Sequence, residues 1–374
     1  MSKPNAPFRY DIVGSFLRPQ TLREATVKYE AGKISKEELT KAEDEAIGDL
    51  ILKQKEAGLS VITDGEFRRS WWHLDFFWGL TGIRKKNLQK GYIFHEEVTR
   101  GETALVEGKI SGENHPFVEH FKYVKAYEDD SVTARQTIPA PAQLLAEITR
   151  SENAKITKEF YPDEEELILD IAKAYQTVIA DLYAAGCKNV QFDDCTWGMY
   201  CDKNFWEMVG IKEEDVAHIA KQYVYLNNLA IEGKAKDMVI TTHVCRGNYH
   251  STWASQGGYE PVAQYLFGKE NVDAFYLEFD DERSGDFKPL RFVSENKKVV
   301  LGLVTSKSPV LEEKEVIKRR IRQAAEYVPL ERLSLSPQCG FASTEEGNKL
   351  TEDEQWEKIR LIREIAGEVW NLKE

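Results

Sequence analysis

The sequence has no excess of positive charge. Its 374 residues include 50 Lys and Arg against 63 Asp and Glu, which gives a net charge of -13, and no basic run interrupts that balance. Nucleic acids and anionic membranes attract basic surfaces, so we expect neither of them as a partner.

Long apolar stretches are also missing. Nowhere do eighteen apolar residues follow one another, the minimum for a transmembrane helix, and the opening residues MSKPNAPFRYD lack the apolar core of a signal peptide. We therefore expect a cytoplasmic protein.

Cysteine is scarce, and its number is odd. In a reducing compartment, cysteines without a regular spacing favour metal binding or catalysis over disulfides. A single cysteine in a strand or helix is usually a small buried hydrophobe, and we interpret Cys187 in that way. The five cysteines are Cys187, Cys195, Cys201, Cys245 and Cys339.

Eight short runs rich in Val, Ile, Phe and Tyr alternate with longer segments that carry apolar residues at helical spacing. Strand–helix alternation repeated eight times closes most naturally into a barrel, whereas an open doubly wound sheet usually has fewer strands. The sequence therefore predicts the α/β class and a single (βα)8 barrel domain over residues 1–374. The runs are YDIVGS (10–15), LSVITDGE (59–66), ARQTIPAP (134–141), NVQFDDC (189–195), MVITTHVC (238–245), AFYLEFD (274–280), KVVLGLVTS (298–306) and RLSLSPQC (332–339).

Several of the intervening segments have clear helix signals. They open with acidic residues near a capping residue, and two of them end at Ala-Gly, which suits the helix dipole and the glycine stop. Residues 67–133, between the second and third strands, instead contain short alternating β segments separated by Gly, and they predict a β insertion over one end of the barrel. The predicted helices cover residues 35–58, 162–186, 212–234 and 350–372.

Polar residues stand at the carboxyl ends of nearly all the predicted strands, where barrel enzymes build their sites. A single acid at a strand end is usually an N-cap for the next helix. Seven of eight strands ending in this way instead indicate a shared pocket. The residues are Ser15, Asp64, Glu66, Asp193, Asp194, His243, Cys245, Glu278, Asp280, Lys307 and Cys339.

Within that set, His243 and Cys245 are two positions apart on one strand, so their side chains point the same way. On its own this pair is weak, because a core histidine explains it as well. Glu278 and Cys339, however, stand at the same height on the sixth and eighth strands. Two thiolates, an imidazole and a carboxylate form a tetrahedral set suited to Zn²⁺.

The charge of such a set indicates its use. Zn²⁺ with two thiolates and a carboxylate carries about one negative charge, which makes it poor at generating hydroxide. It suits a substrate thiol, which it would deprotonate while leaving the sulfur nucleophilic. Glu278 is the hardest of the ligands and the one that we expect to yield its place.

At these residues the sequence resembles the catalytic half of cobalamin-independent methionine synthase, whose zinc is held by His-x-Cys, Glu and a distant Cys. The likeness covers almost the whole chain in the family's order. It is carried by VGSFLRPQTLREA, TDGEFRRSWW, VQFDDC and the zinc segments TTHVC, YLEFDDERSGD and LSPQCG.

The resemblance implies that homocysteine accepts the methyl group, with Ser15 holding its carboxylate and Glu66 and Asp193 holding its ammonium group. The residues agree, since two acids facing a zinc-bound thiol select an amino-acid thiol over a neutral one. For Asp193, a cap or a buried ion pair is the alternative.

Three departures from the family pattern concern the methyl donor. The chain has only the second of the family's two barrels, and the first helps to bind the polyglutamate tail of the folate. Glu147 stands roughly where the family has a tryptophan that stacks on the pterin, for which Trp71, Trp72 or Trp197 are possible substitutes. Aromatic residues near a barrel mouth are more often packing residues.

The third departure is Lys307, which stands where the family has a histidine thought to supply a proton to the donor. Lys307 can serve as that catalytic acid only if burial or its neighbours depress its pKa. It is otherwise an anion-binding or surface lysine.

The sequence thus predicts a zinc-dependent S-methyltransferase that makes methionine from homocysteine and methylfolate. One alternative takes the methyl group from a methylcorrinoid. Another is a zinc-dependent alkyltransferase or lyase that joins a different thiol to an electrophile such as an epoxide. A third is a binding protein with a structural zinc, against which the polar residues around the metal argue. The sequence does not specify an oligomeric state.

Overall fold

A computed structural model describes residues 5–372, and its centre is a parallel sheet of six strands in the order β12-β11-β10-β9-β8-β7. The α/β class is therefore confirmed. All but a few residues of these strands are buried, as expected for a sheet covered by helices on its outer face. The strands are β7 (Gln136–Pro139), β8 (Asn189–Asp193), β9 (Val239–Val244), β10 (Ala274–Glu278), β11 (Lys298–Val304) and β12 (Leu333–Pro337).

Two further short strands form a separate parallel pair. β1 (Val61–Ile62) pairs with β6 (Thr133–Ala134), and β6 is separated from β7 only by Arg135. The predicted strand at 10–15 is a single bridge between Tyr10 and Leu335 of β12.

Residues 10–15 do not form a regular strand, because a nearby side chain binds one of their backbone N–H groups and Gly14 turns the chain. The Asp11 carboxylate accepts hydrogen bonds from the backbone N–H groups of Phe8 and Ile12, and Gly14 has a φ of +143°. The segment still lies between two strands: Asp11 N donates to Leu335 O of β12 at 3.0 Å, and Phe16 N donates to Gly65 O beyond β1 at 3.1 Å.

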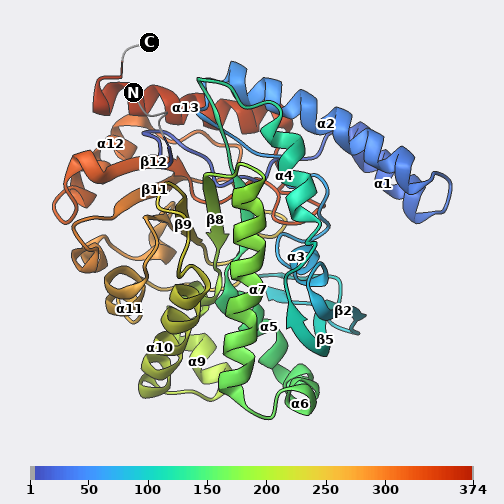
Figure 1. Cartoon of the computed structure of the whole chain (residues 1–374). Helices are drawn as coiled ribbons and strands as arrows, with labels where there is room; N and C mark the ends of the chain where they lie inside the picture. Colours follow the sequence, from blue (N-terminus) through green and yellow to red (C-terminus); the bar gives the residue numbers. More distant parts are fainter. Residues whose placement is uncertain (1–4, 373–374) are drawn as a thin grey trace.

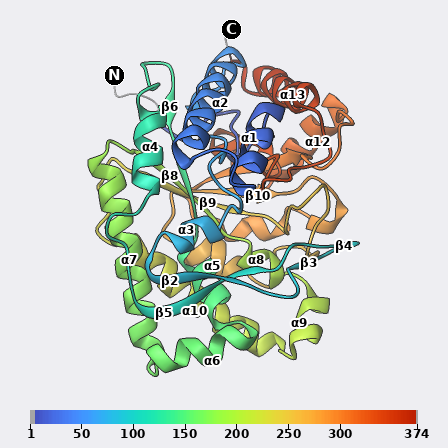
Figure 2. The same ribbon diagram turned by 90° about the vertical axis from the view of Figure 1, so that its right-hand side faces the viewer.

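Two antiparallel hairpins lie between β1 and β6 in the sequence. β2 (Thr81–Asn87) pairs with β5 (Glu102–Ser111), and β3 (Ile93–Phe94) pairs with β4 (Glu97–Val98). In Figure 2, β2 and β5 lie beside α3 and α5, and β3 and β4 reach the edge of the molecule.

Helices follow the strands and pack outside the sheet, with α7 and α10 in contact along one side and α13 against β12 (Figure 1). The four predicted helices are confirmed as α2, α7, α10 and α13. The helices are α1 (Gln20–Glu30), α2 (Lys36–Glu56), α3 (Leu74–Trp78), α4 (Phe117–Lys125), α5 (Pro141–Thr149), α6 (Ser151–Phe160), α7 (Glu164–Ala184), α8 (Thr196–Met199), α9 (Lys203–Val209), α10 (Glu213–Ala230), α11 (Ala263–Lys269), α12 (Lys314–Ala324) and α13 (Glu352–Trp370), with short 3-10 turns η1 (Glu282–Ser284), η2 (Lys288–Phe292) and η3 (Leu330–Arg332).

Across residues 5–372, none of the helices combines the length and the apolar character that spanning a bilayer requires.

Arg135 links residues 10–15 to strands β8 and β10 inside the core. Its guanidinium donates to both carboxylate oxygens of Asp11, at 3.0 and 3.1 Å, to the Tyr276 hydroxyl of β10 at 2.8 Å and to the Asn189 side chain of β8 at 3.1 Å. Both charged side chains are completely buried. A buried charge needs its partner, so this pair fixes residues 10–15 against the sheet.

We expect Arg135→Met to destabilise the protein by about 3–5 kcal/mol, because it leaves the Asp11 carboxylate buried and unpaired. The matched control is Arg84→Met on β2, whose ion pair with Glu107 is half exposed and should contribute about 1 kcal/mol or less. Urea unfolding followed by circular dichroism measures both changes. Equal losses in the two variants would contradict this role for Arg135.

Candidate metal centre and active site

His243, Cys245 and Cys339 come together at the carboxyl ends of β9 and β12. Their ligand atoms all lie within 4.8 Å of one another, and all three residues are buried. His243 is on β9, Cys245 follows that strand directly, and Cys339 follows β12 by two positions. Three of the four predicted metal ligands are therefore brought together.

The chemistry of this group fits a metal ion. Both ring nitrogens of His243 are buried and have no hydrogen-bond partner, an arrangement that is costly unless a ligand completes it. The Cys245 thiol and burial raise the pKa of Cys339 well above its usual value. A divalent cation between an imidazole and two sulfurs would satisfy the nitrogen and stabilise the thiolates, and this donor set suits zinc.

Glu278, the fourth predicted ligand, is completely buried at the end of β10 but is not part of this group. Its Oε2 accepts a hydrogen bond from Arg246 N at 2.7 Å, and its Oε1 lies 3.2 Å from Arg283 Nη2 and 3.6 Å from Lys307 Nζ. Metal binding by Glu278 stays a prediction.

Lys307 is a buried member of an ion-pair cluster. Its Nζ lies 2.7 Å from Asp280 Oδ2. Burial acts to lower the pKa of Lys307, but the carboxylates of Glu278 and Asp280 outweigh it and hold that pKa above its usual value. The depressed pKa that an acid catalyst would need here is therefore not found.

Ser15 lies against the segment that carries Cys339. Phe341 N donates to Ser15 O at 3.0 Å, and Ala342 N donates to its hydroxyl at 3.4 Å. A side chain at Gly340 would collide with the Ser15 hydroxyl, so the close approach requires glycine at that position. The first and last strand ends of the chain thus meet beside the metal group.

Glu66 is positioned by a strained turn after β1. Gly65 and Glu66 both have positive φ, at 66° and 62°, which for Glu66 costs about 1 kcal/mol. Its Oε1 accepts a hydrogen bond from the Thr137 hydroxyl at 2.8 Å and lies 3.2 Å from Arg69 Nη1. Such strain in a buried polar residue is typical of a functional site.

Asp193 ends β8, and its Cα is in register with that of His243. Burial and the nearby charge of Glu66 raise the pKa of Asp193 well above its usual value, and burial likewise raises that of Glu66. Asp193 has a weak partner in Gln191 Nε2 at 3.3 Å. Glu66 has Arg69 beside it, whereas Asp193 has no adjacent cation, so a cationic group near Asp193 would stabilise its charged form.

Comparison with known proteins places the chain in a family. The family model for the cobalamin-independent synthase catalytic domain matches residues 10–368. The chain belongs to the cobalamin-independent methionine synthase family. It is 43% identical over 366 residues to YxjH of Bacillus subtilis (strain 168), an uncharacterized protein, with 98% of this chain and 95% of YxjH covered.

Two solved structures are similar over the whole chain. One, from Listeria monocytogenes, is provisionally described as a vitamin-B12 independent methionine synthase; it has a TM-score of 0.77 and 38% identity, with 98% of each chain covered. The other is a B12-independent methionine synthase from Shewanella sp. W3-18-1 in complex with selenomethionine, with a TM-score of 0.72, 19% identity and 98% of each chain covered.

Enzymes of the cobalamin-independent methionine synthase family are methyltransferases, and this chain is one of them. The family uses zinc, which agrees with the His243, Cys245 and Cys339 group. The family assignment made from the sequence is thus confirmed.

The departures from the family pattern have structural explanations. Glu147 is buried and accepts hydrogen bonds from Tyr92 at 3.0 Å, from Thr103 and from Arg150, so it joins α5 to the β hairpins. Trp71 and Trp197 are buried in the core and offer no exposed stacking surface. Trp72 is half-buried and packs on His73 with a centroid distance of 4.5 Å.

Cys195, which the sequence did not predict as a site residue, lies beside the metal group. Its Sγ lies 2.8 Å from Sγ of Cys245. One signal could have found it: Cys195 follows Asp193 by two positions at the end of a strand, the same spacing that joins His243 and Cys245.

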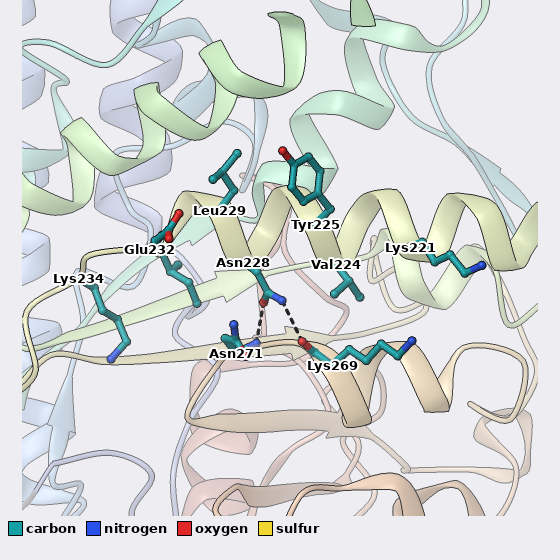
Figure 3. A pocket seen from close by; sticks show the side chains of 10 residues that line it. Lys221, Val224, Tyr225, Asn228, Leu229, Glu232, Lys234, Lys269 and Asn271 are labelled. Atoms are coloured by element: carbon teal, nitrogen blue, oxygen red, sulfur yellow. Dashed lines mark hydrogen bonds between the residues drawn. The ribbon is translucent and has the colours of Figure 1, made fainter. Parts of the chain in front are cut away.

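A surface hollow of ≈ 600 Å³ between α10 and α11 lies apart from this site (Figure 3). Across it, Asn228 Nδ2 donates to Lys269 O at 2.9 Å and Asn271 N donates to Asn228 Oδ1 at 2.7 Å. The lining segments lead into the amino-terminal ends of β9 and β10, whereas the residues of the candidate metal centre lie at the carboxyl ends. The hollow is therefore not the catalytic pocket.

Asp193→Asn should stabilise the substrate-free protein at neutral pH. An unfolded aspartate loses its proton near a pKa of about 3.9, whereas folded Asp193 holds its proton to higher pH. The folded state then binds more protons, so wild-type stability falls relative to the variant as pH rises above about 4. Thermal unfolding between pH 4 and 8 measures this difference.

The control for this comparison is Asp237→Asn. Asp237 is exposed, and its hydrogen bond with Lys188 lowers its pKa, so its replacement should give no gain at any pH. A loss of stability in Asp193→Asn at neutral pH would show that Asp193 already has an adequate partner.

Proposed function

We propose that this chain is a zinc-dependent S-methyltransferase that transfers a methyl group to homocysteine and forms methionine. The observation that carries the proposal is the position of Asp193, a buried acid without an adjacent cation, beside a buried group of one imidazole and two thiols, with the charge of Glu66 nearby. A thiol-binding metal next to an ammonium site suits an amino acid with a side-chain thiol.

We also propose that residues 1–374 form one domain and that its parallel strands close into an eight-stranded (βα)8 barrel. Residues 10–16 hydrogen-bond to β12 on one side and to the end of β1 on the other, and β1 pairs with β6, which continues into β7 and the six-stranded sheet. These contacts support a continuous ring.

We further propose that the hairpins β2–β5 and β3–β4 form an insertion that covers the carboxyl end of this barrel. His95 N donates to Trp253 O at 2.7 Å, and Glu97 lies 2.9 Å from Lys349 Nζ. Trp253 and Lys349 belong to the loops after β9 and β12, which also carry Cys245 and Cys339.

Each proposed residue has a separate task. His243, Cys245 and Cys339 would hold zinc, which keeps a bound thiol deprotonated and nucleophilic at neutral pH. In the family pattern Glu278 is their fourth partner. The other tasks concern the substrate's polar groups.

Glu66 and Asp193 would bind the ammonium group of homocysteine, and the Ser15 hydroxyl would bind its carboxylate. The acids would thereby orient the thiol and exclude thiols without a positive charge, because a buried carboxylate left unpaired is costly. Lys307 would not act as the proton donor, because the carboxylates of Glu278 and Asp280 hold its pKa above the usual value.

Methionine formation tests this function directly. Zinc-loaded protein is supplied with homocysteine and, in parallel, monoglutamyl methylfolate, triglutamyl methylfolate or methylcobalamin. We expect methionine with at least one donor. We also expect the analogue without the amino group, 4-mercaptobutyrate, to react about 10- to 150-fold more poorly in kcat/KM, which is the contribution of one hydrogen bond to a charged group. No methionine from any of the three donors would overturn the proposal.

Removal of a metal ligand should remove the zinc. We expect His243→Ala, Cys245→Ser and Cys339→Ser each to weaken zinc binding by more than about 100-fold, beyond the usual effect of residues that only support ligands. Cys187→Ala is the control, because that thiol is buried and donates to Asn189 O at the opposite end of β8. Metal analysis after dialysis measures the zinc content, and full occupancy in all three ligand variants would exclude this site.

A further inference from the structure

Ser343 lies beside the Cys339 sulfur in the loop that follows β12. The Ser343 side chain is half-buried, and its Oγ is 3.8 Å from Cys339 Sγ, which is within the reach of a hydrogen bond to sulfur. The distance alone does not say which of the two atoms donates, whereas the hydrogen bonds around Ser343 do.

The backbone fixes the orientation of Asn348, the outermost residue of this network. Its Oδ1 accepts a hydrogen bond from Ser251 N at 2.8 Å, and its Nδ2 donates to Ser306 O at 2.8 Å. A backbone N–H can only donate and a backbone carbonyl can only accept, so the amide of Asn348 has one possible orientation. The same Nδ2 donates to Asn248 Oδ1 at 2.9 Å.

Asn248 passes this orientation on to Ser343. Because its Oδ1 faces Asn348, its Nδ2 donates on the other side, to Gly340 O at 2.8 Å and to Ser343 Oγ at 3.1 Å. The Ser343 oxygen is therefore an acceptor toward Asn248. Among the described residues we find Cys339 Sγ as the one other partner of Ser343 Oγ, so the single hydroxyl proton is directed at the sulfur.

The backbone around Ser343 is held on both sides. Buried Arg18 donates through Nη1 to Ala342 O at 3.2 Å and to Thr344 O at 3.0 Å. Trp72 N donates to Ser343 O at 2.9 Å. Three consecutive carbonyl groups are thus bound, and the loop presents the hydroxyl to the sulfur in a pre-organised position.

We propose that Ser343 is a positioning residue of the metal group: its O–H donates a hydrogen bond to the Cys339 sulfur, orients it and draws negative charge from it. This inference rests on the proposed zinc-dependent function and adds to it a residue outside the ligand set. A hydrogen bond to a thiolate is charge-assisted, so it is stronger than the same bond to a thiol. Less negative charge on Cys339 favours the arrival of a further thiolate from the substrate.

Cobalt(II) in place of zinc reports on the Cys339 sulfur, because thiolate ligands give cobalt charge-transfer bands in the near ultraviolet. In the full-length protein we expect these bands to move to longer wavelength in Ser343→Ala, since a sulfur without its hydrogen bond gives up electrons more readily. Ser343→Thr keeps a hydroxyl and should keep the wild-type bands. Bands that stay in place in Ser343→Ala would overturn the inference whatever the metal affinity, because a role in loop packing alone does not change their energy.

Zinc affinity, measured by competition with a chelator, gives a second readout. We expect Ser343→Ala to bind zinc about 10- to 100-fold more weakly, the usual effect of losing a residue that supports a ligand, and Ser343→Thr to bind it nearly as the wild type does. Ser336→Ala is the matched control, because that buried hydroxyl on β12 donates to Pro337 O. Unmoved bands with normal methionine formation by the wild type sink this inference alone, whereas a wild type without stoichiometric zinc removes the proposed function as well.

Discussion

The curvature of the parallel sheet is the constraint on which the site depends. β9 and β12 are three positions apart in the sheet, so in a flat sheet their axes would lie about 14 Å apart at a spacing of about 4.8 Å per strand. The ligand atoms of His243, Cys245 and Cys339 nevertheless lie within 4.8 Å of one another. The strands must therefore curl around a common axis, and whatever stabilises that curl also assembles the metal ligands.

The buried acids around the metal group differ in whether a cation lies beside them. Glu278 and Asp280 face Arg283 and Lys307, so their charges are already compensated. Glu66 has Arg69 beside it, while Asp193 has no adjacent cation, and burial raises the pKa of both acids. Asp193, the acid without an adjacent cation, is where a substrate cation would be stabilised most.

Local signals explain which parts of the fold could be predicted from the sequence. α2 and α13 begin where a capping residue is followed three positions later by a glutamate, and both capping boxes are present. The segment 10–15 has the composition of a strand, but Asp11 and Gly14 divert its backbone, and the ion pair with the distant Arg135 is invisible to local patterns.

The same distinction applies to the site. His243, Cys245 and Cys339 could be predicted because strand ends share one edge of a parallel sheet, which requires no side-chain detail. Cys195 and Glu147 could not, because their roles depend on partners, Cys245 and Tyr92, that lie far away in the sequence. The engagement of Glu278 with Arg283 and Lys307 is likewise a property of packing, since a carboxylate at a strand end suits a metal and an ion pair equally well.

Substrate access follows from how the site is covered. Ser15, Asp193 and His243 are each at most 7% exposed, so a substrate would reach them only if the covering segments moved. The hairpin β3–β4 is tied to the loops over the site by partly exposed ion pairs of Glu97 with His250 and Lys349. Such pairs contribute about 0–1 kcal/mol each, and the hydrogen bonds of the His95 backbone with Trp253 and Thr252 add to this tie.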